Sequence, residues 1–310
     1  MKNNIKFYFF GAGSIIEEHI KSFKGEKGVE LFAILSRTKS KAITLQKKYK
    51  IKFVYNSFEN LKKNKIKKVA VIGVSILSSL EVCKKIFQFF DYCLIEKPPG
   101  YNYKESLKIL KLSKKYNVKV YVALNRRCYP STDQLRKLLK KDRGNRIINI
   151  IDHENIDLQK NKPIKVINNW MYANSIHLID YANIFCRGKK ISIKHFNLSK
   201  SLDRVCIIKF SSGDICIYQG IWNKPGPWGI TVSTKTKYFQ LQPLETLSFR
   251  STDSYKMNTF NYNAKNKEFK HGFKEQAKNF LSAIQNKKHQ LANIEDAVKT
   301  MKLIKNIYNK

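Results

Sequence analysis

Residues 7–16 read FYFFGAGSII, a short apolar run followed by a Gly-x-Gly turn and the start of a helical pattern. This order of strand, turn and helix is typical of the first βα unit of a dinucleotide-binding domain. Gly11 permits the tight turn, and Gly13 allows the backbone to approach a pyrophosphate without an intervening Cβ. The helix N-terminus then offers N–H groups and a positive dipole to the anion. Ile16 stands where the usual fingerprint has a third glycine or an alanine, so the match is incomplete.

The first 124 residues alternate strand and helix patterns. Continuous apolar strands that alternate with helices predict a parallel sheet covered on both faces, as in a Rossmann doubly wound domain. The expected strands are Ile5–Phe10, Val29–Leu35, Lys68–Gly73, Tyr92–Ile95 and Val118–Leu124, and the expected helices are Ser14–Phe23, Lys39–Tyr49, Leu77–Phe90 and Tyr103–Tyr116.

The pattern changes after Asn125, where strand-like runs with polar interruptions follow one another with few helices among them. Such runs predict a large, mostly antiparallel sheet. We therefore expect an α/β chain with an NAD(P)-binding domain at residues 1–124 and a second, α+β domain at residues 125–310. The expected elements of the second domain are the helix Ser131–Leu139, the strands Arg146–His153, Ser192–Leu198, Val205–Phe210, Ile215–Ile221, Ile230–Ser233 and Tyr238–Gln242, and the helices Gly272–Gln285 and Ile294–Tyr308.

The end of the second expected strand indicates which dinucleotide is bound. An NAD site usually has an acidic residue there to hold the ribose hydroxyls, whereas residues 35–39 read LSRTK. The Ser36 hydroxyl can donate a hydrogen bond, and the Arg37 guanidinium can pair with a 2′-phosphate. These residues favour NADP, with NAD as the alternative, since an exposed arginine in a basic chain leaves the same pattern.

The formal net charge of +37 has two interpretations. Clustered Lys and Arg side chains neutralise the phosphates of nucleic acids. The lysines of this chain are instead spread over its whole length, with neither a basic tail nor an arginine stripe with interleaved aromatics. We therefore expect no specific nucleic-acid partner, but a general attraction for anionic ligands.

The six cysteines form no CxxC pair and no set with histidines at zinc-ligand spacing, so no metal site is expected. They indicate reduced, buried thiols of a cytoplasmic protein. The apolar run at the N-terminus is too short for a secretory signal and leads into Glu17 and Glu18. The longest apolar stretch, Val69–Leu77, is also too short to cross a bilayer, which needs about 20 residues.

Three further segments carry polar residues typical of an active site. Residues 94–98 read LIEKP, residues 125–129 read NRRCY, and residues 174–180 read NSIHLID. In this order and spacing the chain resembles the Gfo/Idh/MocA oxidoreductases, the family of glucose–fructose oxidoreductase and inositol dehydrogenase, over essentially its whole length. The Glu-Lys-Pro sequence after a parallel strand is the most specific part of the resemblance.

The resemblance implies roles for two of these residues and a surface for assembly. In the family, the lysine of Glu-Lys-Pro reaches the substrate oxygen beside the nicotinamide, and Lys97 matches it. The family's histidine in an Asp-x-x-x-His helix is an acid/base, and His177 matches that histidine, whereas Ala173 stands in place of the aspartate. Either Asn174 or Asp180 takes over the orienting role, or the chemistry is altered or lost. The resemblance also implies a homodimer or homotetramer formed through the C-terminal sheet.

The same residues have a physical interpretation of their own. Lys97 follows a parallel strand at the edge where open α/β sheets bind ligands, and its ammonium can stabilise charge on a substrate oxygen. Asp180, three residues after His177, shares its helix face and can hold the imidazole in one tautomer. Taken alone, such a histidine is more often a core residue and such a lysine an exposed one. His19 and His271 are expected to be structural or exposed.

Arg126, Arg127 and Tyr129 follow the last strand of the first domain and so open toward the same crevice. A guanidinium there can hold a phosphate or carboxylate, and the tyrosine can stack on a sugar, although an ordinary ion pair explains the arginines equally well. The expected catalytic residues are Lys97, His177 and Asp180, the expected substrate contacts are Arg126, Arg127, Tyr129 and Asn174, and the expected cofactor contacts are Gly11, Gly13, Ser14, Ile15, Ser36, Arg37, Glu96 and Lys97.

We therefore predict an NAD(P)-dependent oxidoreductase that transfers a hydride between nicotinamide and a secondary alcohol or ketone. The expected substrate is a sugar, a cyclitol or, because the positive charge attracts a diphosphate, a nucleotide-activated sugar. The alternative, which Ala173 leaves open, is a non-catalytic dinucleotide-binding regulator or scaffold that retains the fold.

Overall fold

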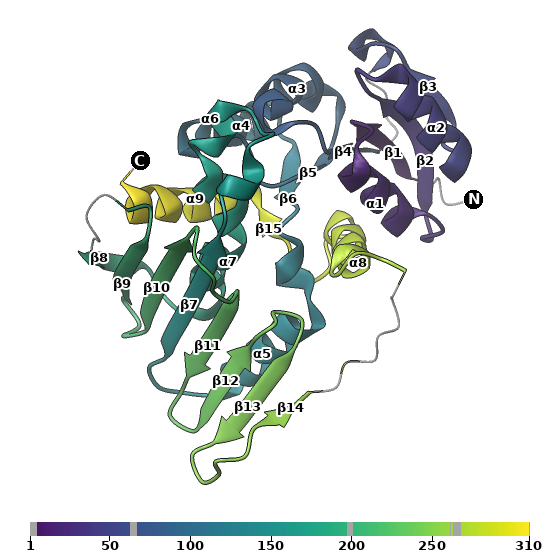
Figure 1. Cartoon of the computed structure of the whole chain (residues 1–310). Coiled ribbons are helices and arrows are strands. Elements are labelled where there is room, and N and C mark those ends of the chain that lie inside the picture. The colour runs from purple at the N-terminus through teal and green to yellow at the C-terminus, as the bar shows by residue number, and fades with distance from the viewer. Residues whose placement is uncertain (1–4, 63–66, 197–200, 261, 263–267, 310) are drawn as a thin grey trace. The chain divides into compact units, whose positions relative to one another are not determined.

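The computed structural model describes residues 5–62, 67–196, 201–260, 262 and 268–309. The chain divides into two compact units, Met1–Cys128 with Lys265–Val298, and Tyr129–Ala264 with Lys299–Lys310. Each unit is built on one sheet, the first of seven strands and the second of eight (Figure 1). Within these described ranges, no helix has both the length and the apolar character that a membrane span requires.

The first unit is a seven-stranded sheet in the order β15-β6-β5-β4-β1-β2-β3. Strands β1 to β6 pair in parallel, and the short β15 joins β6 in the antiparallel direction. The prediction of a Rossmann doubly wound sheet is confirmed, with the strand order that places a switch point between β1 and β4. The strands are β1 (Ile5–Phe10), β2 (Val29–Leu35), β3 (Phe53–Tyr55), β4 (Lys68–Ile72), β5 (Tyr92–Ile95), β6 (Lys119–Val122) and β15 (Ala292–Asn293), and the helices are α1 (Ser14–Phe23), α2 (Lys39–Tyr49), α3 (Ser79–Ile86), α4 (Tyr103–Lys115) and α8 (Phe273–Ile284).

Alternate side chains of β1 fill the two faces of this sheet. Phe7 and Phe9 belong to the core shared with α1, α2 and α8. Tyr8 and Phe10 point the other way, and the ring of Phe90 lies 5.2 Å and 5.7 Å from theirs. The apolar strand is therefore continuous in sequence because both of its faces are buried.

The units differ from the expected domains in the placement of a late segment, which contains α8, β15 and the start of α9 (Ile294–Tyr308). Helix α8, expected in the second domain, belongs to the first unit, where it packs against α1. The reason is the Phe280 side chain, which is fully buried and contacts the rings of Phe7, Phe23 and Tyr121. The late helix thereby completes a core whose other members come from the first part of the chain.

The second unit is an eight-stranded sheet in the order β14-β13-β12-β11-β7-β10-β9-β8. Strands β7 and β10 are parallel and the other neighbours are antiparallel, which confirms the predicted mostly antiparallel sheet. The end of the strand expected at Ser192–Leu198, residues 197 and 198, lies outside the described residues. The elements are α5 (Pro130–Lys141), β7 (Ile147–Glu154), α6 (Ile164–Ile167), α7 (Ile176–Phe185), β8 (Lys190–Phe196), β9 (Arg204–Phe210), β10 (Ile215–Trp222), β11 (Gly229–Ser233), β12 (Lys237–Leu241), β13 (Leu247–Ser251), β14 (Asn258–Thr259) and α9 (Ile294–Tyr308), which begins among residues of the first unit.

The central strand β7 alternates between a buried and a half-buried face. Its inward positions are Ile148, Ile150, Asp152 and Glu154, and α7 packs against this strand. Two of the four inward positions therefore carry carboxylic acids in the interior of the unit, where an isolated charge is costly.

Candidate active site

The turn after β1 forms the start of α1. Gly11 has a φ of 112°, which favours glycine, and a Cβ there would lie 2.4 Å from the Gly73 carbonyl oxygen. A Cβ at Gly13 would meet no described protein atom within 4 Å, so the surface before the helix is open. The N–H groups of Ser14 and Ile15 belong to the first helical turn, where they have no intrahelical acceptor. These residues fit the pyrophosphate of a dinucleotide.

Ile16 explains how the chain departs from the usual glycine fingerprint. Its side chain is fully buried, and a Cβ on Gly73, just after β4, would lie 2.6 Å from the Ile16 Cγ1. The close packing of helix on sheet that a third glycine usually permits is achieved here by a glycine on the facing strand.

The end of β2 lies beside the glycine turn, because the Gly11 N–H donates to the Leu35 carbonyl at 2.8 Å. The Ser36 hydroxyl accepts a hydrogen bond from the Thr38 N–H at 3.3 Å, and the Arg37 side chain is exposed. The hydroxyl and the guanidinium therefore lie on the same edge of the sheet as the α1 N-terminus.

The Glu-Lys-Pro turn follows β5 on the same edge. The Glu96 N–H donates to the Ile72 carbonyl at 2.8 Å, next to Gly73. The Glu96 Oε2 accepts a hydrogen bond from the Lys97 N–H at 3.2 Å, and the Lys97–Pro98 bond is cis. Lys97 is half-buried and follows the carboxyl end of β5, beside the ends of β4 and β1 in the sheet order.

His19 holds this turn, a function that the sequence analysis did not assign to it. Its Nε2 lies 2.6 Å from the Glu96 Oε1, its exposed fraction is 2 %, and its ring packs against Phe273. The signal was present in the spacing, because His19 lies three and four residues from Ile16 and Phe23 on the buried stripe of α1. A polar side chain on such a stripe requires a buried partner.

The turn after β6 contains the two expected arginines. Arg127 is 8 % exposed, and its Nη1 lies 3.7 Å from the Asp296 Oδ2. Arg126 is more exposed, and the Asn125 side chain anchors the turn by donating to the His271 carbonyl at 2.9 Å. The ion-pair interpretation therefore describes Arg127, and Arg126 is the more accessible guanidinium.

The expected site residues of the second unit cluster around α7. Residues 171–175 form a π-helical turn that leads into α7, and such turns are frequent at functional sites. His177 and Asp180 are 6 % and 2 % exposed, and the Asp180 Oδ1 accepts a hydrogen bond from the Thr300 hydroxyl at 2.8 Å. Tyr129 is 5 % exposed and immediately precedes α5.

Asn174, expected to contact substrate, donates its side-chain amide to both carboxylate oxygens of Glu154 at 3.0 Å. The Trp170 indole donates to the same group at 2.7 Å, and the Ser175 hydroxyl lies 3.5 Å from it. Burial, followed by repulsion from Asp152, raises the pKa of Glu154 to about 8. Glu154, which the sequence analysis did not identify, is therefore the acceptor around which the π-helical turn is organised.

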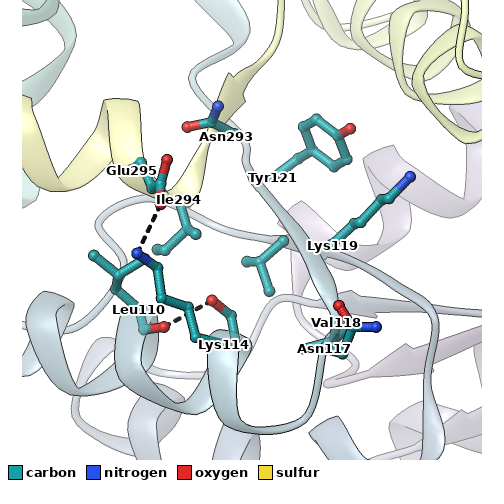
Figure 2. A pocket seen from close by; sticks show the side chains of 11 residues that line it. Leu110, Lys114, Asn117, Val118, Lys119, Tyr121, Asn293, Ile294 and Glu295 are labelled. Carbon is teal, nitrogen blue, oxygen red and sulfur yellow. Dashed lines mark hydrogen bonds and ion pairs between the residues drawn. The ribbon is translucent and has the colours of Figure 1, made fainter.

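A pocket of about 320 Å³ opens at the other edge of the first sheet (Figure 2). It lies at the amino end of β6, and an ion pair of 3.0 Å between Lys114 and Glu295 crosses one side of it. None of the predicted site residues lines it, so this pocket is separate from the edge that carries the glycine turn. It is lined by Leu110, Ser113, Lys114, Asn117, Val118, Lys119, Val120, Tyr121, Asn293, Ile294 and Glu295.

The parallel sheet, its glycine turn and the mostly antiparallel second sheet define a protein with a dinucleotide-binding Rossmann domain joined to an α+β domain. Residues 5–124 match the model of the Gfo/Idh/MocA family, described as an oxidoreductase family with an NAD-binding Rossmann fold. Over these residues the resemblance drawn from the motifs is confirmed, and with it the prediction of an NAD(P)-binding oxidoreductase. A search of curated proteins found no match.

Solved structures share the fold over nearly the whole chain. The dehydrogenase MviM from Clostridium difficile is 19% identical, with a TM-score of 0.78 over 99% of each chain. The UDP-N-acetylglucosamine 3-dehydrogenase GnnA from Acidithiobacillus ferrooxidans is 12% identical, with a TM-score of 0.78 over 98% of this chain and 96% of that one. The 3-ketoreductase KijD10 from Actinomadura kijaniata, in complex with NADP and TDP-benzene, is 11% identical, with a TM-score of 0.77 over 99% and 98%. At these identities the likeness shows the fold.

Replacement of His19 by alanine should lower the free energy of unfolding by about 1–3 kcal/mol, because the half-buried Glu96 carboxylate loses its short hydrogen bond. The His19→Gln variant should lose less than half of this, since its amide nitrogen can take the place of Nε2. Urea denaturation of the three proteins measures the difference. Equal losses in both variants would show that the ring packs but that its hydrogen bond does not hold the turn.

Proposed function

We propose that the protein is an NADP(H)-dependent dehydrogenase or reductase acting on a secondary alcohol or ketone of a sugar or cyclitol. The observation that carries the proposal is the joining of the glycine turn to the Glu-Lys-Pro turn through the hydrogen bond between His19 and Glu96. This bond ties the helix that fits a pyrophosphate to the loop that carries Lys97. The first domain would bind the cofactor and the second the substrate.

A nucleotide-activated sugar is the substrate class we favour. Two structural relatives support it, one named a UDP-N-acetylglucosamine 3-dehydrogenase and the other a 3-ketoreductase in complex with NADP and TDP-benzene. The net charge of +37 would attract the diphosphate of such a substrate. In this proposal Arg126 and Arg127 lie on the substrate side with Tyr129 and Asn174, and Arg126 makes the main anion contact because it is the more exposed arginine.

The cofactor and the three catalytic residues have separate roles in the proposed reaction. The nicotinamide, when bound, supplies the hydride acceptor for oxidation and the hydride donor for reduction. Lys97 donates a hydrogen bond to the substrate oxygen and stabilises its developing negative charge. His177 accepts the hydroxyl proton during oxidation and returns it during reduction, while Asp180 holds its tautomer. The proposed cofactor contacts are Gly11, Gly13, Ser14, Ile15 and Glu96 near the pyrophosphate and nicotinamide, and Ser36 and Arg37 at the 2′-phosphate.

A non-catalytic dinucleotide-binding scaffold is the second candidate. Ala173 favours it, because the carboxylate that the family resemblance implies at this position is missing. Such a protein would bind the cofactor but would transfer no hydride. The six free, buried cysteines support a cytoplasmic location for either candidate, because thiols persist in a reducing compartment.

We also propose that the second sheet mediates assembly with a second copy of the chain. The face of this sheet opposite to the inward positions of β7 carries half-buried isoleucines, and Ile147 is 46 % exposed. An apolar face of this kind is typical of an interface in a homodimer or homotetramer. The residues that form it are Ile147, Ile151, Ile207, Ile217 and Ile221.

Titration with NADPH and with NADH, followed by quenching of tryptophan fluorescence, tests the cofactor. NADPH should bind more tightly than NADH. Arg37→Ala should lower the affinity for NADPH at least about tenfold and change the affinity for NADH little, because the guanidinium pairs with the 2′-phosphate. Lys41→Ala removes an equally exposed charge nearby and should change neither. NADH binding as tight as that of NADPH in the natural chain would contradict the NADP assignment.

Lys97→Ala should lower the rate of hydride transfer about 100-fold or more, because the substrate oxygen loses its charged donor. Its affinity for NADPH should stay within about twofold. The reaction is followed by NADPH consumption with keto sugars and keto nucleotide sugars, and Lys104→Ala, an exposed lysine of α4, is the control. Full turnover in Lys97→Ala would remove this lysine from the active site, and NADPH binding without turnover in the natural chain would favour the scaffold.

The variant Ile217→Lys should dissociate the proposed assembly, because it places a charge in an apolar interface. Light scattering should give a multiple of 36.3 kDa for the natural chain and 36.3 kDa for the variant. Tyr255→Lys changes a side chain that is 95 % exposed and should leave the mass unaltered. A natural chain that is monomeric would overturn this part of the proposal.

A further inference from the structure

Two carboxylic acids lie side by side in the interior of the second unit. Asp152 and Glu154 occupy consecutive inward positions at the end of β7, with exposed fractions of 0 % and 2 %. Both side chains lie on the same buried face of the strand, and two like charges buried so close together cannot both be ionised at neutral pH without a large cost. The pair therefore holds one proton.

The Glu154 side of the pair is bound to the chain that precedes α7. Trp170, Asn174 and Ser175 all direct side-chain donors at its oxygens, at 2.7 Å, 3.0 Å and 3.5 Å. These three residues lie in or next to the π-helical turn. The buried Glu154 carboxyl group thus holds the π-helical turn, whose backbone lacks the regular hydrogen bonds of an α-helix.

The Asp152 side of the pair is bound to the sheet and to the C-terminal helix. The Tyr218 hydroxyl donates to the Asp152 Oδ2 at 2.7 Å and lies 2.8 Å from the Tyr308 hydroxyl. The Trp222 indole donates to the Tyr308 hydroxyl at 3.2 Å. Asp152 is therefore anchored to β10 and, through the Tyr218 and Tyr308 hydroxyls, to α9.

We propose that the Asp152–Glu154 pair, with one shared proton, is the positioning group of the substrate-side helix. Glu154 fixes the turn that presents Asn174 and leads into His177, so the orienting carboxyl comes from the neighbouring strand instead of the helix. The significance of this for catalysis rests on the proposed function of His177. The hydrogen bonds on which it depends are independent of that function.

Because the pair holds a proton, its contribution to the stability of the fold depends on pH. The pKa of Glu154 is raised from 4.5 to about 8, so its contribution to stability is fully present below pH 4.5 and is lost as the pH rises through 8. Burial raises the pKa of Tyr218 and Tyr308 well above their usual value, so these groups stay neutral throughout. The elements around the network also carry other titratable or charged groups, and the Arg204 guanidinium of β9 lies over the Tyr308 ring. These groups include His153 of β7, His177 and Asp180 of α7, Lys209 of β9, and Lys299, Lys302 and Lys305 of α9.

Urea unfolding between pH 6 and pH 9 tests the shared proton. The unfolding constant of the natural chain should rise about tenfold or more over this range, and Glu154→Gln should abolish that rise, because a neutral amide has no proton to lose over this range. Asp157→Asn, an exposed acid close by, removes the same charge and should keep the rise. A rise in Glu154→Gln equal to that of the natural chain would overturn the proposal.

The imidazole signals of the six histidines in an NMR spectrum test the positioning. The His177 signal, identified by its loss in His177→Gln, should move in Glu154→Ala and move less in Glu154→Gln, which keeps one of the two acceptor oxygens. An unmoved signal in folded Glu154→Ala would overturn the proposal. Neither measurement uses a substrate, so failure of the proposed function, seen as no hydride transfer by the natural chain, is distinct from failure of the pair.

Discussion

The close approach of two backbones, at Gly11 and Gly73, is the constraint on which the carboxyl edge of the first sheet depends. A single Cβ at either glycine would collide, at Gly11 with a carbonyl oxygen and at Gly73 with Ile16. Because the ends of β1 and β4 meet so closely, Glu96 follows at hydrogen-bonding distance from β4 and is reached by His19 on α1. The open surface at Gly13 and the position of the Glu-Lys-Pro turn follow from this contact.

The second unit depends on a different constraint, which is the burial of two acids. Apolar residues of the same size would pack β7 without any electrostatic cost, and replacement of buried ionic groups in this way is often stabilising. The chain instead keeps Asp152 and Glu154 and surrounds them with donors from Tyr218, Trp170 and Asn174. A network of this kind specifies one arrangement of the turn before α7, and such specificity is what the role proposed for α7 requires.

The fold could be predicted from the sequence wherever the pattern is local. The glycine turn and the apolar strands predict the Rossmann sheet, because strands that are buried on both faces have continuous apolar sequences. The short strands β3 and β13 were not expected, because three to five residues carry little periodicity and their pairing is decided by neighbours. The placement of α8 could not be predicted either. The apolar positions of this helix, including Phe280, have the spacing of any amphipathic helix, and only the tertiary contacts of the core show to which unit the helix belongs.

The candidate site could be predicted where a motif is contiguous, as at Glu96 and Lys97, but not where partners are distant in sequence. His19 is 77 positions from Glu96, and Asn174 is 20 positions from Glu154. The sequence does show acids at alternate positions of β7, Asp152 and Glu154. Without knowledge of their burial, however, this pattern suggests the exposed end of a strand. The buried stripe of α1 indicates that His19 needs a partner, but the local sequence does not indicate which distant residue supplies it.

The central claim, that a dinucleotide binds at the glycine turn, is tested most directly by NMR of the protein labelled with ¹⁵N-glycine. The chain has 13 glycines, distributed over both units, and each backbone amide reports on its own surroundings. Addition of NADPH should shift the signals of Gly11 and Gly13, assigned by substitution, and leave those of Gly188 and Gly213 in place. Saturating NADPH that moves neither Gly11 nor Gly13 would contradict the account.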